Sequence, residues 1–203
     1  MNSKFRTLGF KATAGVFFIL TALFSYLNNN GDPLFATLVV CGGLFGLMGD
    51  IFLAIKGIAP EHFKKLVAVG MTYFGLGHVF YFAAILVSTE IYPLSFLISL
   101  AFVAVAFFGL STKRFANIGK MKYVCLGYYY ILATTLLQSL FAAIYSDGIF
   151  ATIFFIGTCF FFVSDTLLSF MYFGGAKGKA VSIINLSTYY TAQLLIAMSI
   201  LFI

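Results

Sequence analysis

Apolar residues dominate seven long stretches of the chain, and short polar segments separate these stretches. They cover residues 8–27, 34–55, 66–88, 91–111, 122–145, 149–173 and 180–203. Each has about the 20 mainly apolar residues that a helix needs to cross a bilayer. The remaining residues form short loops, so the pattern predicts an all-α transmembrane bundle of seven spans, with eight as the alternative count. We expect residues 1–203 to form a single membrane domain.

The positions of the charged residues predict the orientation of these spans. The chain is 62% hydrophobic and 9% charged, with a net charge of +6. All twelve Lys and Arg residues fall at the N-terminal end or beside the loops that follow the even-numbered spans, whereas the opposite loops carry Asp32, Glu90 and Asp147 and no basic residue. Basic loops face the cytoplasm. We therefore expect a multi-pass protein of the cell (inner) membrane with a cytoplasmic N-terminus, and no nucleic-acid partner is needed to explain the charge.

Asp50 interrupts the apolar run of the second span, in the stretch CGGLFGLMGDIFLAI. A charge inside a span costs about 2.5–3.5 kcal/mol on insertion scales and commonly faces the bundle interior or a water-filled cavity. Gly42 or Gly43, Gly46 and Gly49 recur at helical spacing beside it, so a neighbouring helix can approach this face closely. Asp50 would lie about 7–8 Å below the cytoplasmic surface by helical rise.

A second acid, Asp165, lies in the sixth span within FFVSDTLLSF. Helical rise places it about 12 Å from the cytoplasmic end. Both acids belong to spans that run toward the cytoplasm, so we expect them in the same half of the membrane. An acid inside a span is a candidate functional residue.

Other polar residues in the spans are candidates for supporting roles. His78 lies about 18 Å deep in the third span, with Tyr81 one turn later in GLGHVFY. A lone histidine in a helix is commonly a core residue, and here it is also a candidate for orienting a carboxylate or a water. Asn185, Tyr189 and Gln193 form one polar ridge on the last span.

Two further polar features are weaker candidates for a catalytic role. Tyr130, Thr134 and Gln138 form a stripe on the fifth span that either lines a polar cavity or hydrogen-bonds a neighbouring helix. Cys41, Cys125 and Cys159 are isolated in separate spans, so neither a metal-binding cysteine pair nor a disulfide framework is predicted.

The motifs GDIFL, GLGHVFY, FFVSDTLLSF and YYTAQLLIAMS resemble, in order and spacing, the YhhN-like lysoplasmalogenase family of integral membrane proteins. The resemblance covers spans 2, 3, 6 and 7. It implies hydrolysis of the vinyl ether bond of lysoplasmalogens to a fatty aldehyde and a glycerophospho-alcohol, without a metal or a cofactor. Some members carry Lys-Pro in the first span where this chain has Lys11-Ala12, which leaves the role of Lys11 open.

Vinyl ether hydrolysis begins with protonation of a carbon and then needs an activated water, so one protonated carboxyl and one carboxylate suffice, as in glycoside hydrolysis. The sequence makes Asp50 and Asp165 the candidate pair. We favour the deeper Asp165 as the acid and Asp50 as the base, although coupled carboxyl groups titrate as a pair. The partners would be a single-chain ether phospholipid, the bilayer and water. Candidate phosphate ligands near the cytoplasmic surface are Lys11, Lys64, Lys65, Lys113 and Arg114.

Two other classes of membrane protein also use intramembrane acids. GxGD proteases use an aspartate pair, but this chain has GLMGD and no Pro-Ala-Leu segment. A proton-coupled transporter or a ligand-binding seven-helix protein would use Asp50, His78 and Asp165 as a relay, although no inverted repeat or broken helix is evident.

The one-sided distribution of basic residues predicts a topology that reporter fusions can measure. Fusions within residues 56–65 and 113–122 should report a cytoplasmic location, and a fusion at the C-terminus an external one, because basic loops are retained inside. A cytoplasmic C-terminus would contradict seven spans and indicate an eighth.

Overall fold

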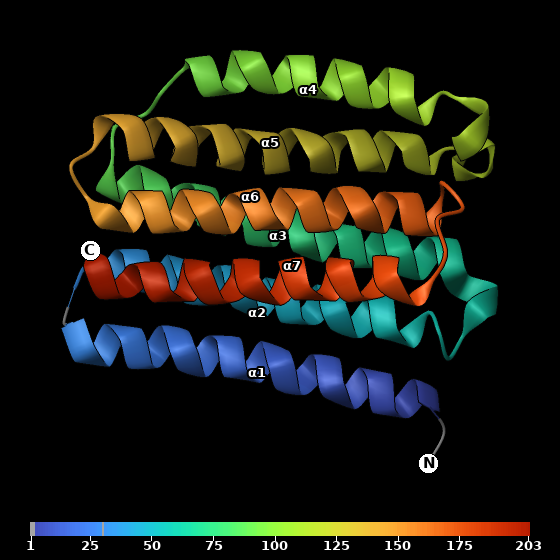
Figure 1. The fold of residues 1–203 in the computed structure, drawn as a ribbon, viewed down its shortest axis with the longest axis horizontal. Helices are drawn as coiled ribbons and strands as arrows, with labels where there is room; N and C mark the ends of the chain where they lie inside the picture. Colours follow the sequence, from blue (N-terminus) through green and yellow to red (C-terminus); the bar gives the residue numbers. More distant parts are fainter. Residues whose placement is uncertain (1–2, 30) are drawn as a thin grey trace.

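The computed structural model describes residues 3–29 and 31–203, and seven long α-helices account for most of them. They are α1 (Ser3–Asn29), α2 (Pro33–Ile55), α3 (Phe63–Ser88), α4 (Leu94–Leu110), α5 (Met121–Tyr145), α6 (Ile149–Tyr172) and α7 (Lys179–Met198). Three short 3₁₀ helices are η1 (Pro60–His62), η2 (Lys113–Ile118) and η3 (Ser199–Phe202). The helices lie side by side along one axis (Figure 1). Each predicted span corresponds to one helix, and these described residues contain neither an eighth long helix nor a strand, so the predicted all-α bundle is confirmed.

Six of these helices are long and apolar enough to cross a membrane, which makes the chain a multi-pass membrane protein. The seventh, α4, has 17 residues and a length of about 25 Å by helical rise. Its sequence predicted a span over 91–111, but the helix begins only after Pro93, which occupies the N-cap position. Proline has no backbone N–H, and it disfavours helical geometry in the residue before it, so the preceding residues stay outside the helix.

Six helices form a closed ring, and α4 lies outside it. Around the ring α1 packs on α2, α2 on α3, α3 on α5, α5 on α6, α6 on α7, and α7 returns to α1. Helix α4 packs chiefly on α5, at the edge of the bundle in Figure 1. The polar residues that the sequence singled out on α2, α3, α6 and α7 therefore come from helices that surround one interior.

Helices α2 and α3 approach each other most closely where glycines face one another. A Cβ atom at Gly77 would lie 2.9 Å from the carbonyl oxygen of Gly42. A Cβ atom at Gly70 would likewise lie 3.3 Å from the carbonyl oxygen of Gly49. The close helix approach that the glycines of the second span predicted is therefore present, and Asp50 is held beside it.

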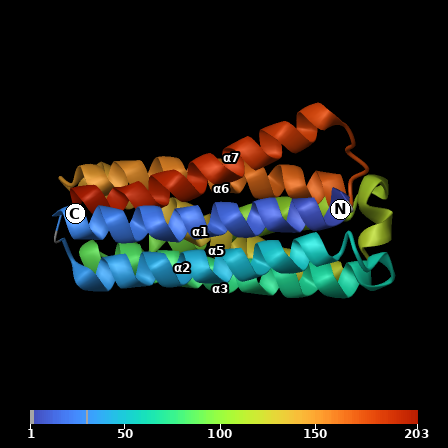
Figure 2. The same ribbon diagram turned by 90° about the horizontal axis from the view of Figure 1, so that it is seen from below.

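The bundle has one basic end. The N-terminal end of α1 and the α2–α3, α4–α5 and α6–α7 connections lie together there (Figures 1 and 2). We call this the basic end, because all the basic residues of the sequence are on or near these segments. Its cytoplasmic location stays a prediction from the charge pattern.

We expect Gly77→Ala to destabilise the protein by about 1–3 kcal/mol, the usual range for overpacking. The new methyl group would meet a backbone oxygen of α2, which cannot rotate away. Thermal unfolding of the protein in detergent measures the effect.

Gly127→Ala is the matched control, because Gly127 is also inside a helix but has no atom within 4 Å of an added Cβ. It should be neutral or slightly stabilising, since alanine favours the helix. Equal stability of the two variants would show that the close approach of α2 and α3 at Gly77 does not limit the stability of the protein.

Candidate active site

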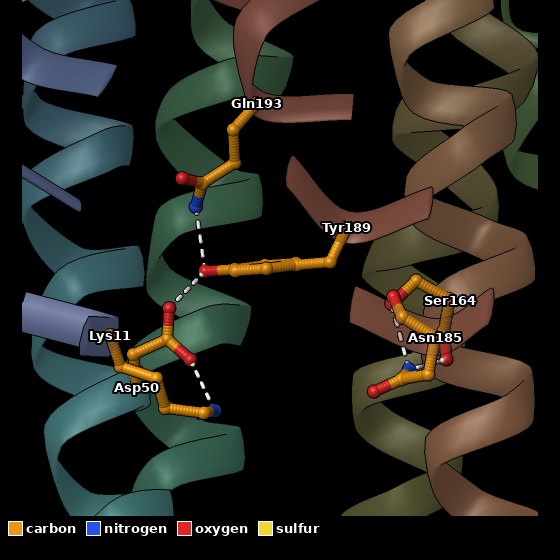
Figure 3. A network of polar contacts seen from close by, with 6 residues as sticks. All are labelled: Lys11, Asp50, Ser164, Asn185, Tyr189 and Gln193. Atoms are coloured by element: carbon orange, nitrogen blue, oxygen red, sulfur yellow. Dashed lines mark hydrogen bonds and ion pairs between the residues drawn. The ribbon is translucent and has the colours of Figure 1, made fainter. Parts of the chain in front are cut away.

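Asp50 is almost fully buried on α2 and has a partner on each carboxylate oxygen. Lys11 of α1 donates from Nζ to Oδ1 at 2.7 Å, and Tyr189 of α7 donates its hydroxyl to Oδ2 at 2.7 Å. Gln193 donates in turn to the Tyr189 hydroxyl at 2.6 Å. Figure 3 shows this chain of contacts across three helices. A buried carboxylate needs such compensation, because an unpaired charge in an apolar interior is very costly.

Asp165 of α6 has a different kind of partner. The hydroxyl of Tyr128, on α5, donates a hydrogen bond to its Oδ2. The side chain is only 8% exposed, and no ion pair involves it among the described residues. Asp50 therefore faces a cation, whereas Asp165 faces a neutral phenol.

One small cavity brings the two acids together, although they are far apart in the sequence. Its volume, counted over the positions open to the centre of a water molecule, is about 20 Å³, enough for roughly one water. Helices α1, α2, α3, α6 and α7 contribute its wall, which consists of Lys11, Asp50, Leu53, Phe74, Ser164, Asp165, Leu168, Asn185, Leu186 and Tyr189. We call it the central cavity.

The residues of the polar ridge on the last span contact two different helices, α2 and α6. Tyr189 and Gln193 point toward Asp50, whereas Asn185 turns to α6 and donates to the carbonyl oxygen of Ser164 at 2.7 Å (Figure 3). The Ser164 hydroxyl donates back to the Asn185 carbonyl oxygen at 3.2 Å. This reciprocal pair joins α6 to α7 beside the central cavity.

His78 does not make the orienting contact that its position suggested. Its ring is buried among aromatic side chains, with centroids 4.6 Å from Phe161, 5.8 Å from Tyr81 and 5.9 Å from Tyr128. Neither ring nitrogen has a hydrogen-bond partner among the described residues, and neither does the Tyr81 hydroxyl. Lys11, Tyr128 and Tyr189 make the hydrogen bonds to the acids instead.

Gln138, the last residue of the polar stripe on the fifth span, makes contacts at the opposite end of the bundle, whereas the Thr134 hydroxyl bonds to its own helix. Gln138 donates to the carbonyl oxygen of Glu90 at 2.7 Å and accepts from the Tyr92 amide at 3.2 Å. It also accepts from the Ser95 hydroxyl. Of the two roles left open for this stripe, the structure favours hydrogen bonding to a neighbouring segment, the α3–α4 connection.

Two further cavities, the vestibule and the inner cavity, adjoin the central one, and a third space, the outer groove, adjoins the inner cavity. The vestibule, about 270 Å³, opens at the basic end and includes Lys11, Lys56 and Ser182. The inner cavity, about 30 Å³, lies beside Asp165 and Tyr128. The outer groove, about 340 Å³, is lined mainly by apolar side chains of α4 and α6.

Neighbouring spaces in this set share some of their lining side chains. Leu53 and Leu168 line the vestibule, the central cavity and the inner cavity alike. Tyr129 and Ser169 line both the inner cavity and the outer groove. The four spaces thus form a series from the basic end, past the two acids, to the lipid-facing groove at α4.

The remaining basic candidates lie away from the acids. Lys64, Lys65 and Lys113 are exposed, and Arg114 donates from Nε to the carbonyl oxygen of Gly174 at 2.8 Å. None of the four lines the vestibule, the central cavity, the inner cavity or the outer groove. Their role as phosphate ligands stays a prediction.

Sequence reasoning missed two residues of this site and misjudged the contact of a third. The motifs and stripes of the sequence do not single out Tyr128, yet it lies seven residues after the start of α5 while Asp165 lies seven before the end of α6. Matching depth on adjacent antiparallel helices is a signal that could have paired them. Lys56 was read only as a topology determinant, and Lys11 binds Asp50 where surface exposure was expected.

A comparison with known proteins places the chain among its relatives. No curated protein and no solved structure matches it. The profile of the YhhN family, which includes lysoplasmalogenases, matches residues 6–200, nearly the whole chain. The family resemblance of the four motifs is therefore confirmed, and the chain belongs to the YhhN family.

Proposed function

We propose that this protein is a membrane hydrolase that cleaves the vinyl ether bond of lysoplasmalogens, with choline or ethanolamine head groups. The products are a fatty aldehyde and glycerophosphocholine or glycerophosphoethanolamine. The observation that carries the proposal is the pair of buried acids, Asp50 and Asp165, on one water-sized cavity. Family membership is consistent with this activity.

Asp165 is the proposed acid. It transfers its proton to the β-carbon of the alkenyl group, and the ether oxygen stabilises the resulting oxocarbenium ion. Its only hydrogen-bond partner among the described residues is the phenol of Tyr128. In a low-dielectric site, a carboxyl group without a neighbouring cation stays protonated more readily than a carboxyl group in an ion pair. It can therefore donate that proton to the substrate.

Asp50 is the proposed base. It takes a proton from the water that adds to the oxocarbenium carbon, forming a hemiacetal. The hemiacetal then collapses to the aldehyde: Asp50 returns its proton to the leaving glycerol oxygen, and the hemiacetal hydroxyl proton goes to Asp165. The cycle consumes one water, and both acids regain their starting state. Lys11 and Tyr189 hold Asp50 in place throughout.

The cavity series supports an amphiphilic, single-chain substrate. Its polar end, the vestibule, contains two lysines, and its far end is an apolar groove beside lipid-exposed residues such as Val105. The acids lie between them. A lysoplasmalogen has the same order, with a phosphate head group, a vinyl ether and one long hydrocarbon chain.

We expect purified protein to release aldehyde from a lysoplasmalogen, and Asp50→Asn and Asp165→Asn each to lower kcat by about 10²–10⁴-fold, the range for lost acid–base catalysis. The amide keeps the volume of each side chain but cannot exchange the proton. Because the two acids act as a unit, the double variant should be scarcely worse than either single one.

Asp50→Asn leaves Lys11 without its anion, which can destabilise the bundle. Asp50→Asn combined with Lys11→Met removes both charges and tests the same chemistry in a neutral site. Thermal unfolding must show that each variant is folded. If folded Asp165→Asn retains most of the activity, the two-carboxylate mechanism is wrong. A transporter would leave the lipid intact in every variant.

Tyr128→Phe should lower kcat by about tenfold or more with little change in KM, because one hydrogen bond to a charged or reacting group contributes roughly 1.5–3 kcal/mol. The ring and its packing remain, so only the positioning of Asp165 is lost. Tyr130→Phe is the control on the same helix, since among the described residues the hydrogen bond of Tyr130 to another side chain is made by its backbone carbonyl and not by its hydroxyl. A rise in KM alone for Tyr128→Phe would place the hydroxyl in substrate binding and contradict a positioning role.

A further inference from the structure

The vestibule is a preformed polar space at the basic end of the bundle. The N-terminal part of α7 tilts away from α1 toward this end (Figure 2). The space that remains, about 270 Å³, is lined by residues of α1, α2, α6 and α7 and by the first residues after α2. It shares Lys11, Leu53, Leu168, Asn185 and Leu186 with the central cavity. Anything bound in the vestibule is therefore next to the two acids.

The vestibule has an excess of positive charge. Its lining contains Lys11 and Lys56 and no acidic residue. Lys11 is compensated by Asp50. Lys56 has no carboxylate partner in the described part of the chain, and its ammonium lies 3.8 Å from the ring centroid of Tyr172.

The surroundings of Lys56 disfavour its charge unless an anion is present. Burial, and then the positive charge of Lys11, lower the pKa of Lys56 to about 7. The Tyr172 ring is a weak substitute for an anion, since a cation–π contact contributes only about 0.5–2 kcal/mol. Ser182, in the first turn of α7, adds a hydroxyl at the same space. In the structure this hydroxyl donates to the carbonyl oxygen of Gly178 at 3.2 Å, and a rotation about χ1 would turn it toward an anion. Phosphate oxygens accept hydrogen bonds from both kinds of donor.

We propose that the vestibule binds the phosphate group of the single-chain substrate and that Lys56 is its main ligand. This assignment rests on the proposed function. In a lysoplasmalogen only the three-carbon glycerol backbone separates the phosphate from the vinyl ether. A phosphate beside Lys56 thus leaves the ether to extend past Leu53 and Leu168 toward the acids, and the hydrocarbon chain to continue toward the inner cavity.

The geometry distinguishes Lys56 from the other basic residues of this end. Lys64, Lys113 and Arg114 are exposed and do not line the vestibule, and Arg114 already donates to the carbonyl oxygen of Gly174. Lys11 already donates to Asp50, so its contribution to the phosphate is secondary. One lysine therefore provides the selective contact.

The test measures binding without turnover. The probe is a saturated 1-O-alkyl lysophospholipid, which has the head group and the chain but no vinyl ether, titrated into the full-length protein in nanodiscs. Lys56→Met should weaken its binding by about tenfold or more, the effect of losing a charge-assisted hydrogen bond. Lys56→Arg should retain most of the affinity. Lys177→Met, at an exposed position of the same end, should leave it unchanged.

A second ligand separates phosphate recognition from a structural role. A 1-O-alkylglycerol, which lacks the phosphate, should bind wild type and Lys56→Met equally well. An equal loss for both ligands would show that Lys56 only packs against Tyr172 and would overturn the proposal. No loss for either ligand would overturn it as well.

Free phosphate is the alternative source of the same chemistry. Glycerophosphocholine should compete with the lipid probe in a Lys56-dependent way, whereas inorganic phosphate should compete much more weakly. If inorganic phosphate binds as tightly as the lipid, the vestibule is a free-anion site and the head-group assignment is wrong. Lys56-dependent lipid binding without aldehyde release would refute the proposed reaction and leave this subsite intact.

Discussion

The burial of two acids inside an apolar bundle is the constraint on which the rest of the site depends. Asp50 is compensated by Lys11 and Tyr189, which come from two other helices. Asp165 is compensated by Tyr128 of a third. Because an uncompensated buried charge costs several kcal/mol, the Asp50 contacts fix α1, α2 and α7 relative to one another. The Asp165 contact fixes α6 against α5. The same contacts give the two acids unlike surroundings, as acid and base roles require.

Close helix packing makes that register possible. Small residues let backbones approach in a membrane, where there is no hydrophobic drive between helices. At the α2–α3 contact Gly77 lies against the backbone of Gly42, and large aromatic side chains such as Tyr81 and Phe161 then fill the interior of the ring. The two nitrogens of His78, which have no hydrogen-bond partner among the described residues, lie in this aromatic filling.

The cavities differ in the polarity of their walls. The central cavity has room for roughly one water, which in the proposed reaction limits the access of bulk water to the cationic intermediate. The vestibule brings positive charge to one side of the acids, and the outer groove brings apolar surface to the other. The side chains of Leu53 and Leu168 line both the vestibule and the central cavity. A change in the conformation of these two side chains can therefore connect the two spaces without any movement of the helices.

Hydrophobic periodicity and charge position alone determined the all-α class, the number of long helices and the candidacy of Asp50 and Asp165, because a span length and an intramembrane acid are local features of a sequence. Only the tertiary structure decided which helices meet. It placed α4 outside the ring, paired Lys11 with Asp50 and Tyr128 with Asp165, and left His78 without a polar partner among the described residues. These outcomes depend on helix rotation and neighbour order. One-dimensional spacing does not encode these, since a residue's depth along its helix says nothing about the direction in which its side chain points.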